Sequence, residues 1–303
     1  MANINVACIG ECMVELTQGE TPNSLNKNFA GDTYNTAYYL KYVLNDQASV
    51  SYVSAVGVDG LSEALVNRLA GTGLDVSNIT RLEDGKVGLY LVENDSDGER
   101  HFVYWRETSA AKRMFDGEQG EQLLASLASY DLVYLSGISL AILSEEARSK
   151  LIQTLTDSPV EVVFDPNYRP KLWASAETAS KAMQALVQAT KATVLSTLDD
   201  ETLLNGLTEQ EQVVSFWQQH GASDVVVKQG ADGCFIASEG LNVSSRAGIV
   251  PIDTTGAGDS FNGGYLAGLQ QGLSRVESAK LGHLVASQVI QQRGAIVESI
   301  NLD

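Results

Sequence analysis

Short apolar runs rich in β-branched residues alternate with longer segments of helical spacing along most of this chain. The apolar runs have the length of buried strands and comprise Ile4–Ile9, Ser51–Val56, Asp131–Leu135, Val160–Phe164, Thr193–Leu195 and Asp224–Val227. The segments of helical spacing comprise Asp32–Leu44, Ser62–Leu69, Glu118–Ser129, Glu145–Leu155, Ala176–Thr190 and Glu209–His220. This alternation predicts an α/β fold in which a mostly parallel sheet carries helices on both faces.

One region departs from the alternation. Val87–Glu93 and Arg100–Arg106 have period-two spacing and are joined by the turn-forming run Asn94–Gly98, which predicts a β-hairpin. Met13–Thr17 predicts another short strand. We expect these strands to form a small sheet that projects as a lid from a single domain. The expected lid covers roughly residues 11–18 and 86–107, within a domain covering residues 1–303.

Helix ends and interior glycines give further expectations. Asp32 or Thr33 is expected to cap the helix that begins there. The longest helical pattern is Ser274–Gln292. The helical pattern Ala257–Leu269 contains four glycines, each of which costs about 1 kcal/mol relative to alanine in a helix interior. Their number predicts that this helix packs closely against another element or a ligand.

The charge balance excludes some classes of partner. The 303 residues include 20 Lys and Arg and 38 Asp and Glu, a net charge of −18. Phosphate backbones and anionic membranes are bound by clustered cations, so no nucleic-acid or membrane partner is expected. The sequence shows no secretory leader pattern and no apolar run of membrane-spanning length, which favours a soluble cytoplasmic protein. Cys8 and Cys234 lie in apolar runs and are expected to be buried thiols.

A turn of small residues lies between two carboxylates in the segment Asp253–Phe261, directly ahead of a helical pattern. Backbone N–H groups at such a helix start can bind an anion. Asp259 would stand beside that anion, where it could accept a proton from a nucleophile that attacks a phosphate. Taken alone, these residues favour a capped turn with a first-turn acid. No Walker A motif occurs, which excludes a P-loop nucleotidase.

The segment Asp253–Phe261 resembles the C-terminal signature of the ribokinase-like (PfkB) sugar kinases, and Gly31–Thr36 resembles their N-terminal glycine-rich motif. Ala30 stands where a second glycine is usual. The resemblance covers essentially the full chain. It implies a three-layer sandwich with a small β-sheet lid, and transfer of a phosphoryl group from ATP with Mg²⁺. It also implies a catalytic base, Asp259, an anion hole of Gly256, Ala257 and Gly258, and sugar contacts from Gly31, Asp32 and Asn35.

The fuller pattern is similar to the 2-keto-3-deoxygluconate kinase branch of that family. The segments that carry this similarity are Gly10–Leu16, Gly88–Tyr90, Tyr104–Arg106, Leu135–Ile138 and Asp165–Trp173. It implies a sugar-acid acceptor whose 6-phosphate feeds the Entner–Doudoroff route. Arginine can bind a carboxylate through two parallel hydrogen bonds, so Arg106 and Arg169 are candidate anchors. Tyr90 and Tyr104 lie on the hairpin and could cover the ligand, although cross-strand packing explains each equally well.

Val227–Gly233 resembles the nucleotide-binding loop of the family, in which a lysine follows a strand and precedes two glycines. Lys228, Gly230, Ala231 and Gly233 are the candidate residues, while the run Cys234–Ala237 favours a plain hairpin at the same place. The remaining candidates near the phosphates or the adenine are Asn167, Thr197, Gly258 and Ser287.

The metal ligands are not assigned, because the acidic run Asp199–Glu201 also suits a helix N-terminus. Three other functions stay open: a kinase for a neutral ketose or pentose, a non-catalytic sugar-acid sensor, and a dehydrogenase. The dehydrogenase lacks the G-x-G-x-x-G run that should follow the first strand. The open edges of the lid strands favour a homo-oligomer, a dimer formed through the lid.

Overall fold

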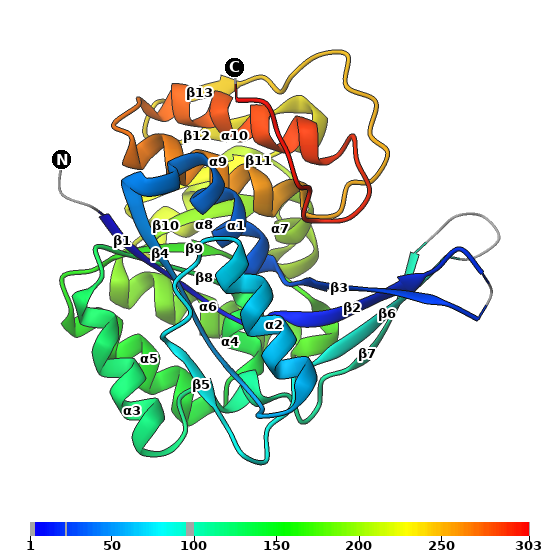
Figure 1. Cartoon of the computed structure of the whole chain (residues 1–303). Coiled ribbons are helices and arrows are strands. Elements are labelled where there is room, and N and C mark those ends of the chain that lie inside the picture. Colours follow the sequence, from blue (N-terminus) through cyan, green and yellow to red (C-terminus); the bar gives the residue numbers. More distant parts are fainter. Residues whose placement is uncertain (1–3, 22, 95–99, 303) are drawn as a thin grey trace.

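The centre of the protein is a nine-stranded sheet, seen in a computed structural model that describes residues 4–21, 23–94 and 100–302 (Figure 1). In spatial order its strands are β13 (Leu241–Val243), β12 (Cys234–Ile236), β11 (Asp224–Lys228), β10 (Thr193–Thr197), β9 (Glu161–Asp165), β8 (Leu132–Ser136), β1 (Ile4–Ile9), β4 (Ala48–Val56) and β5 (Ile79–Arg81). Strands from β11 to β5 pair in parallel, whereas β12 and β13 pair antiparallel. The predicted, mostly parallel sheet is confirmed.

Helices cover both faces of this sheet, which gives three layers (Figure 1). One face carries α1 (Asp32–Leu44), α2 (Gly60–Gly71), α9 (Ala257–Gln270) and α10 (Arg275–Val289). The other carries α3 (Gly117–Ser126), α4 (Gly137–Ile142), α5 (Glu145–Asp157), α6 (Ala176–Thr190), α7 (Leu198–Asn205) and α8 (Gln210–Gln219). Successive side chains of a strand point to opposite faces. Accordingly, Val6 and Cys8 of β1 enter the first core, and Ala7 and Ile9 enter the second.

The small sheet has four strands rather than the three predicted, and it projects from the domain beside α2 (Figure 1). Its order is β3 (Leu25–Ala30), β2 (Met13–Gln18), β6 (Leu89–Asn94) and β7 (Arg100–Trp105). The predicted hairpin is confirmed as β6–β7, while residues 95–99 of its connecting loop lie outside the described residues. The prediction missed β3 because its first four residues are all exposed, so the strand shows no apolar alternation.

The start of α1 and the end of α10 differ from the prediction. Gly31 is the N-cap of α1, and no side chain makes a capping bond there. The two residues expected to cap this helix, Asp32 and Thr33, form hydrogen bonds with other elements. The Asp32 carboxylate accepts from Asn167 at 2.8 Å, and the Thr33 hydroxyl lies 3.1 Å from the Tyr52 hydroxyl. Helix α10 ends at Val289 rather than Gln292. There the next carbonyl, that of Ile290, accepts instead from the backbone of the loop ahead of α9, at 2.7 and 3.1 Å.

The predicted burial of Cys8 and Cys234 is confirmed. Cys8, Cys12 and Cys234 are all free and buried. Burial raises the pKa of the Cys234 thiol to about 12, so this group stays protonated. Within the described part of the chain, no helix is long and apolar enough to cross a membrane.

The chain reverses its direction of winding at β1, which positions the site. Strands β4 and β5 lie on one side of β1, and β8, β9, β10 and β11 follow in order on the other. In open parallel sheets, ligands bind outside the carboxyl ends of the strands near such a reversal. A ligand site is therefore expected at the carboxyl ends of β1, β8 and β9.

The glycines of α9 allow it to lie directly against α1 and α10. A Cβ built on Gly263 would lie 2.7 Å from the Cβ of Tyr39 and 2.8 Å from the carbonyl oxygen of Thr36. One built on Gly264 would lie 2.9 Å from the Cα of Gly282. These approaches are too close for any side chain, so the close packing predicted for this helix is confirmed.

Replacing Gly263 with alanine should destabilise the protein although alanine favours helix. Overpacking a tight contact typically costs 1–3 kcal/mol, which exceeds the helix-propensity gain of about 1 kcal/mol. The matched control is Gly71→Ala at the end of α2, where nothing lies within 4 Å of the new Cβ. Urea unfolding should show Gly263→Ala below wild type and Gly71→Ala at or above it. Equal stability of the two variants would contradict the packing argument.

Candidate active site

Polar and charged residues, among them the predicted site residues Thr197 and Lys228, lie at the carboxyl ends of the parallel strands. Strand β9 ends at Asp165, β10 at Thr197 and β11 at Lys228. Gly10 and Glu11 directly follow β1. Because parallel strands end at one edge of the sheet, these residues share the edge that the reversal at β1 marks for a ligand.

The turn before α9 is held in place by Asp253. Its carboxylate accepts from the backbone N–H of Thr255 at 2.9 Å and of Gly294 at 2.8 Å. Gly256 is the N-cap of α9 with φ 75°, a left-handed conformation that favours glycine. No capping bond from a side chain is found at this helix start within the described chain. The Ala257 N–H donates to the Thr254 carbonyl at 3.2 Å, so one of the predicted anion-hole amides is already engaged.

Asp259 lies in the first turn of α9 and is hydrogen-bonded to α1. The Asn35 side-chain amide donates to its Oδ2 at 2.8 Å, and the Thr36 hydroxyl donates to its backbone carbonyl at 3.2 Å. Burial, and then the nearby charge of Asp32, raises the pKa of Asp259 to about 7, although the bond from Asn35 opposes this shift. A carboxylate with a pKa near neutrality is suited to accept a proton in catalysis.

Lys228 forms a buried cluster just below the start of α9. Its Nζ lies 2.8 Å from Asp165 Oδ2 and 3.0 Å from Asn262 Oδ1, and Asn262 Nδ2 donates to the same Asp165 oxygen at 2.6 Å. A Cβ built on Gly258 would lie 3.7 Å from the Nζ. The structure therefore puts a positively charged side chain beneath the N-terminal end of α9.

The glycine-rich turn before α1 joins this site from the other side. Gly31 lies so close to the chain after β1 that a Cβ would stand 2.2 Å from the Glu11 carbonyl oxygen. Asp32 accepts from the Asn167 amide at 2.8 Å, and Asn167 has φ 34°. Together with the bond between Asn35 and Asp259, these contacts bring the two predicted motifs together across more than two hundred residues.

The small sheet contributes Tyr90, Tyr104 and Arg106. The Tyr90 hydroxyl donates to Glu15 Oε2 at 2.5 Å, and its ring centroid lies 5.7 Å from that of Tyr104. Arg106 Nη2 donates to Glu11 Oε2, and its guanidinium carbon lies 5.9 Å from the Tyr104 ring centroid. Cross-strand packing of the two tyrosines is thus confirmed.

Arg169 approaches the same tyrosine from the main domain. Burial raises the pKa of Tyr104, whereas the charges of Arg106 and Arg169 lower it, so both arginines lie near this ring. Arg169 Nη1 donates to the Tyr168 carbonyl at 2.9 Å and to Asp200 Oδ1 at 3.2 Å, and its side chain is 52% exposed. Two cations therefore converge on one part of an acidic protein.

The nucleotide-loop residues form the predicted hairpin. Gly230 and Ala231 lie in the single-turn 3-10 helix between β11 and β12, and Gly233 follows it with φ 106°. Thr197 caps α7 by accepting from the Asp200 N–H at 3.2 Å. Ser287 is buried in α10, where its hydroxyl donates to the Leu284 carbonyl at 2.8 Å. The contacts described for the hairpin glycines and Ser287 do not join them to the cluster around Asp259.

Comparison with known proteins agrees with this arrangement. Residues 3–301 match the model of the pfkB family carbohydrate kinases. The chain belongs to the pfkB family. It is 45% identical to the 2-dehydro-3-deoxygluconokinase of Escherichia coli K12, over 96% of each chain.

Two solved structures show that the fold is ribokinase-like. The Thermotoga maritima 2-dehydro-3-deoxygluconokinase has a TM-score of 0.83 at 20% identity, covering 98% of this chain and 97% of that one. The Xylella fastidiosa fructokinase with bound ATP has a TM-score of 0.79 at 20% identity, covering 96% and 93%. Kinases for a sugar acid and for a neutral sugar share this fold, so the fold alone does not decide the acceptor.

The acidic run at the start of α7 divides between two roles in this pfkB protein. Glu201 is fully buried and accepts from Ser196 and Trp217 at 2.6 Å each and from Asn205 at 2.8 Å, which makes it a structural residue. Asp200 instead pairs with Arg169. Among the described residues, no group of three or more His, Cys, Asp or Glu side chains could hold a metal ion.

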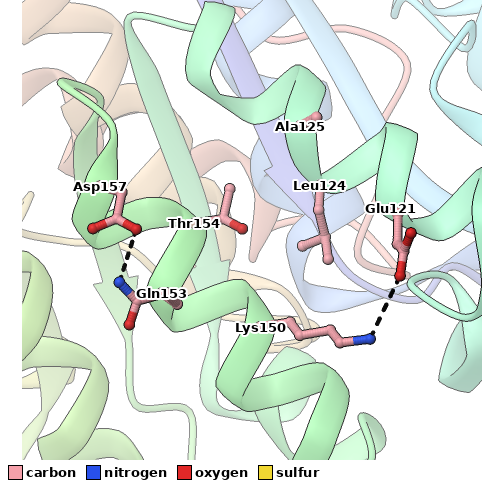
Figure 2. Close-up of a pocket in the computed structure, with 7 residues that line it drawn as sticks. All are labelled: Glu121, Leu124, Ala125, Lys150, Gln153, Thr154 and Asp157. Carbon is pink, nitrogen blue, oxygen red and sulfur yellow. Dashed lines mark hydrogen bonds and ion pairs between the residues drawn. The ribbon is translucent and has the colours of Figure 1, made fainter.

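A hollow of about 330 Å³ lies elsewhere on the pfkB domain, between α3 and α5 (Figure 2). Its lining polar groups pair with one another: Gln153 donates to Asp157 at 2.8 Å, and Lys150 lies 3.8 Å from Glu121. None of the predicted site residues lines it. The hollow is therefore separate from the candidate site.

Sequence reasoning did not assign Asp165, Asn262 or Glu11 to the site. Asp165 and Glu11 lie in segments that resemble the family, but the resemblance gave neither residue a function. Asn262 could have been found from helical spacing, since it lies three residues after Asp259 and so shares its face of α9. The pairing of Lys228 with Asp165 could not be predicted from helical spacing, because the two residues are 63 positions apart in the sequence.

The raised pKa of Asp259 predicts a stability that depends on pH. Between pH 3.8 and about 7 the folded state binds more protons here than the unfolded state, so unfolding becomes easier as the pH rises. Asp259→Asn removes this effect. It should therefore be more stable than wild type at pH 8, by at most ~4 kcal/mol for three pKa units, and nearly equal at pH 4.

Thermal unfolding at the two pH values tests this, with Asp75→Asn as a control of opposite sign. Burial raises the pKa of Asp75, but bonds from Ser77 and Ser51 outweigh it and the net shift is downward. Asp75→Asn should therefore lose stability at pH 8. A pH-independent difference between wild type and Asp259→Asn would exclude the assigned shift.

Proposed function

We propose that this pfkB-family protein transfers the γ-phosphoryl group of ATP to the terminal hydroxyl of 2-keto-3-deoxygluconate, also called 2-dehydro-3-deoxygluconate. The products are the 6-phosphate and ADP. The E. coli relative at 45% identity, which carries the name of this activity, supports the assignment. The observation that carries it is the 2.8 Å bond between Asn35 and Asp259, which joins the acceptor turn to an acid at an anion-binding helix start.

In this proposal Asp259 is the general base. It accepts the proton of the terminal hydroxyl as that oxygen attacks the γ-phosphorus in line. Its pKa of about 7 means that much of it is ionised at neutral pH and can still take a proton. Asn35 holds one carboxylate oxygen, which leaves the other for the substrate.

The start of α9 stabilises the charge of the transferring group. The N–H groups around Gly256–Gly258 and the positive end of the helix dipole would face the phosphoryl oxygens. Lys228 adds a buried cation below Gly258. We propose that Asn167, Thr197, Gly230, Ala231, Gly233 and Ser287 bind the remainder of ATP.

A magnesium ion fits this site only as a loosely held ion. Mg²⁺ in such kinases takes most of its ligands from phosphate oxygens and water, which agrees with the lack of a three-acid cluster in the described chain. Asp200 would hold it, because this carboxylate lies in the first turn of α7, beside Thr197 at the carboxyl end of β10. When bound, the ion neutralises charge on the phosphates.

Arg106 and Arg169 would bind the substrate carboxylate. Both lie near Tyr104, and the planar fork of arginine matches a carboxylate. Gly31, Asp32, Tyr90 and Tyr104 would contact the sugar chain. The small sheet would act as a lid over the ligand, excluding water that could otherwise hydrolyse ATP.

We also propose that two copies associate through the lid. Its edge strand β7 exposes apolar side chains, with Phe102 39%, Tyr104 45% and Trp105 57% exposed. An exposed, aromatic strand edge can pair with a second copy. The partners would then be this chain, ATP and the sugar acid.

An ADP-release assay across acceptors tests the function. We expect turnover with 2-keto-3-deoxygluconate far above that with fructose or ribose. Asp259→Asn should lower kcat by ~10²–10⁴-fold, the usual effect of losing a general base. For wild type, kcat/KM should fall as the pH drops below about 7, because the base becomes protonated.

Other outcomes of this assay would point to other functions. Preference for a neutral ketose would indicate a fructokinase-type enzyme. No ADP with any acceptor would indicate a non-catalytic sensor. A near-normal kcat for Asp259→Asn would remove Asp259 from the role of base.

Light scattering tests the lid dimer. Wild type should have the mass of two chains, and Trp105→Glu should shift it to one, because a charge in an apolar interface is costly. Leu203→Glu is the control, since Leu203 is 64% exposed but lies on α7. A monomeric wild type would contradict the proposal.

A further inference from the structure

The root of the small sheet contains a buried ion pair in which one partner, Glu11, has no role in the proposed reaction. Glu11 is 2% exposed and Arg106 is 9% exposed, and Arg106 Nη2 donates to Glu11 Oε2. Glu11 directly follows the end of β1 at Gly10, and Arg106 directly follows β7. The pair thus joins the main sheet to the lid strand that carries Tyr104.

We propose that Glu11 is a positioning residue that sets the preference for an acidic acceptor. It holds Arg106 at one terminal nitrogen and leaves the other donors of the guanidinium to the substrate carboxylate. This inference rests on the proposed function, because it requires an acceptor that carries a carboxylate.

The form of the contact supports this role. A guanidinium has five N–H donors and commonly binds a carboxylate through two parallel bonds. Here a single nitrogen donates, and Glu11 Oε1 is buried without a hydrogen-bond partner among the described residues. A two-bond pairing would satisfy both oxygens but would occupy more of the donors. The observed pairing keeps them for a ligand.

Backbone contacts on two sides fix Glu11. A Cβ built on Gly88 would lie 2.6 Å from Glu11 Oε1 and 3.3 Å from the Arg106 Cβ. A Cβ built on Gly31 would lie 2.2 Å from the Glu11 carbonyl oxygen. Both positions are glycine, so Gly88 packs against the Glu11 carboxylate and Gly31, in the acceptor turn, packs against the Glu11 backbone. Glu11 has little freedom to move away from Arg106.

Stability alone does not explain a buried pair of this kind. Removing two charges from water is costly, and an apolar pair of similar volume is often as stable or more so. A carboxylate close to an anionic substrate would also repel it. Both costs are explained if Glu11 orients Arg106. Displacing a binding group by about 1 Å can lower the reaction rate by up to ~10²-fold.

The contact with Tyr104 shows where the Arg106 guanidinium lies. Its guanidinium carbon lies 5.9 Å from the centre of the Tyr104 ring, and Arg169 acts on the same tyrosine. Arg169 is half exposed and bonds Asp200 at 3.2 Å, so it is the less enclosed anchor. Arg106 is then the fixed one, and Glu11 is the residue that fixes it.

The test compares Glu11→Gln and Glu11→Asp with wild type in the ADP-release assay. Glu11→Gln removes the charge and keeps the length, whereas Glu11→Asp keeps the charge and is one methylene too short to reach Arg106. We expect both variants to raise KM for 2-keto-3-deoxygluconate about 10-fold and to change KM for ATP less than about 2-fold. KM does not depend on the fraction of folded enzyme, so partial unfolding does not hide the result.

The matched control is Glu63→Gln, which also removes a carboxylate from an arginine pair, with Arg81 at 3.0 Å on the surface. Its KM values should equal those of wild type.

An unchanged KM for the sugar acid in both variants would overturn the inference alone. So would a lower KM in Glu11→Gln with a wild-type value in Glu11→Asp, because Glu11 would then act only by repelling the substrate. A wild-type protein that phosphorylates neutral ketoses and no sugar acid would overturn the proposed function together with this inference.

Discussion

The buried cluster of Asp165, Lys228 and Asn262 is the interaction on which the site depends. It joins the last residue of β9, the last residue of β11 and the second turn of α9 with bonds of 2.6 to 3.0 Å. Burying an ion pair is favourable only when its remaining donors and acceptors are satisfied. Here Asn262 also donates to the Tyr134 hydroxyl at 3.0 Å, and the Asn167 N–H donates to Asp165 Oδ1 at 3.1 Å. The cluster thereby fixes α9, and with it Asp259, above the sheet edge.

Electrostatics explain how a chain of net charge −18 can bind two anionic substrates. The overall charge would repel them at long range, but such interactions are screened beyond about 10 Å in salt. Close to the site the balance is different. Lys228 lies below α9, and Arg106 and Arg169 both act on Tyr104. In the proposed site, these local cations, each paired with one carboxylate, would attract the substrates.

The sequence predicted the regular elements and missed those set by tertiary contacts. The bounds of β1, α1 and α6 agree with the structure to the residue, because apolar periodicity there is strong. Strand β3 lacks that periodicity, and α4 and α7 are too short to show it. In the site, the motifs at Gly31–Thr36 and Asp253–Phe261 could be read directly. The bonds between them could not, since the partner of Asp259 lies 224 residues away.

The acceptor and phosphoryl-transfer groups lie on separate stretches of the chain. Most acceptor candidates precede β8 and belong to the small sheet or the turn before α1, whereas the anion-binding turn and Lys228 follow β10. Helix α1, with the turn before it, is tied to α9 by close packing at Gly263 and by the bond between Asn35 and Asp259, whereas β6 and β7 belong to the separate small sheet. Under the proposed roles, substitutions in β6 and β7 would change which sugar is accepted while the phosphoryl-transfer groups remain intact. Such modularity gives one scaffold an evolutionary route to many acceptors.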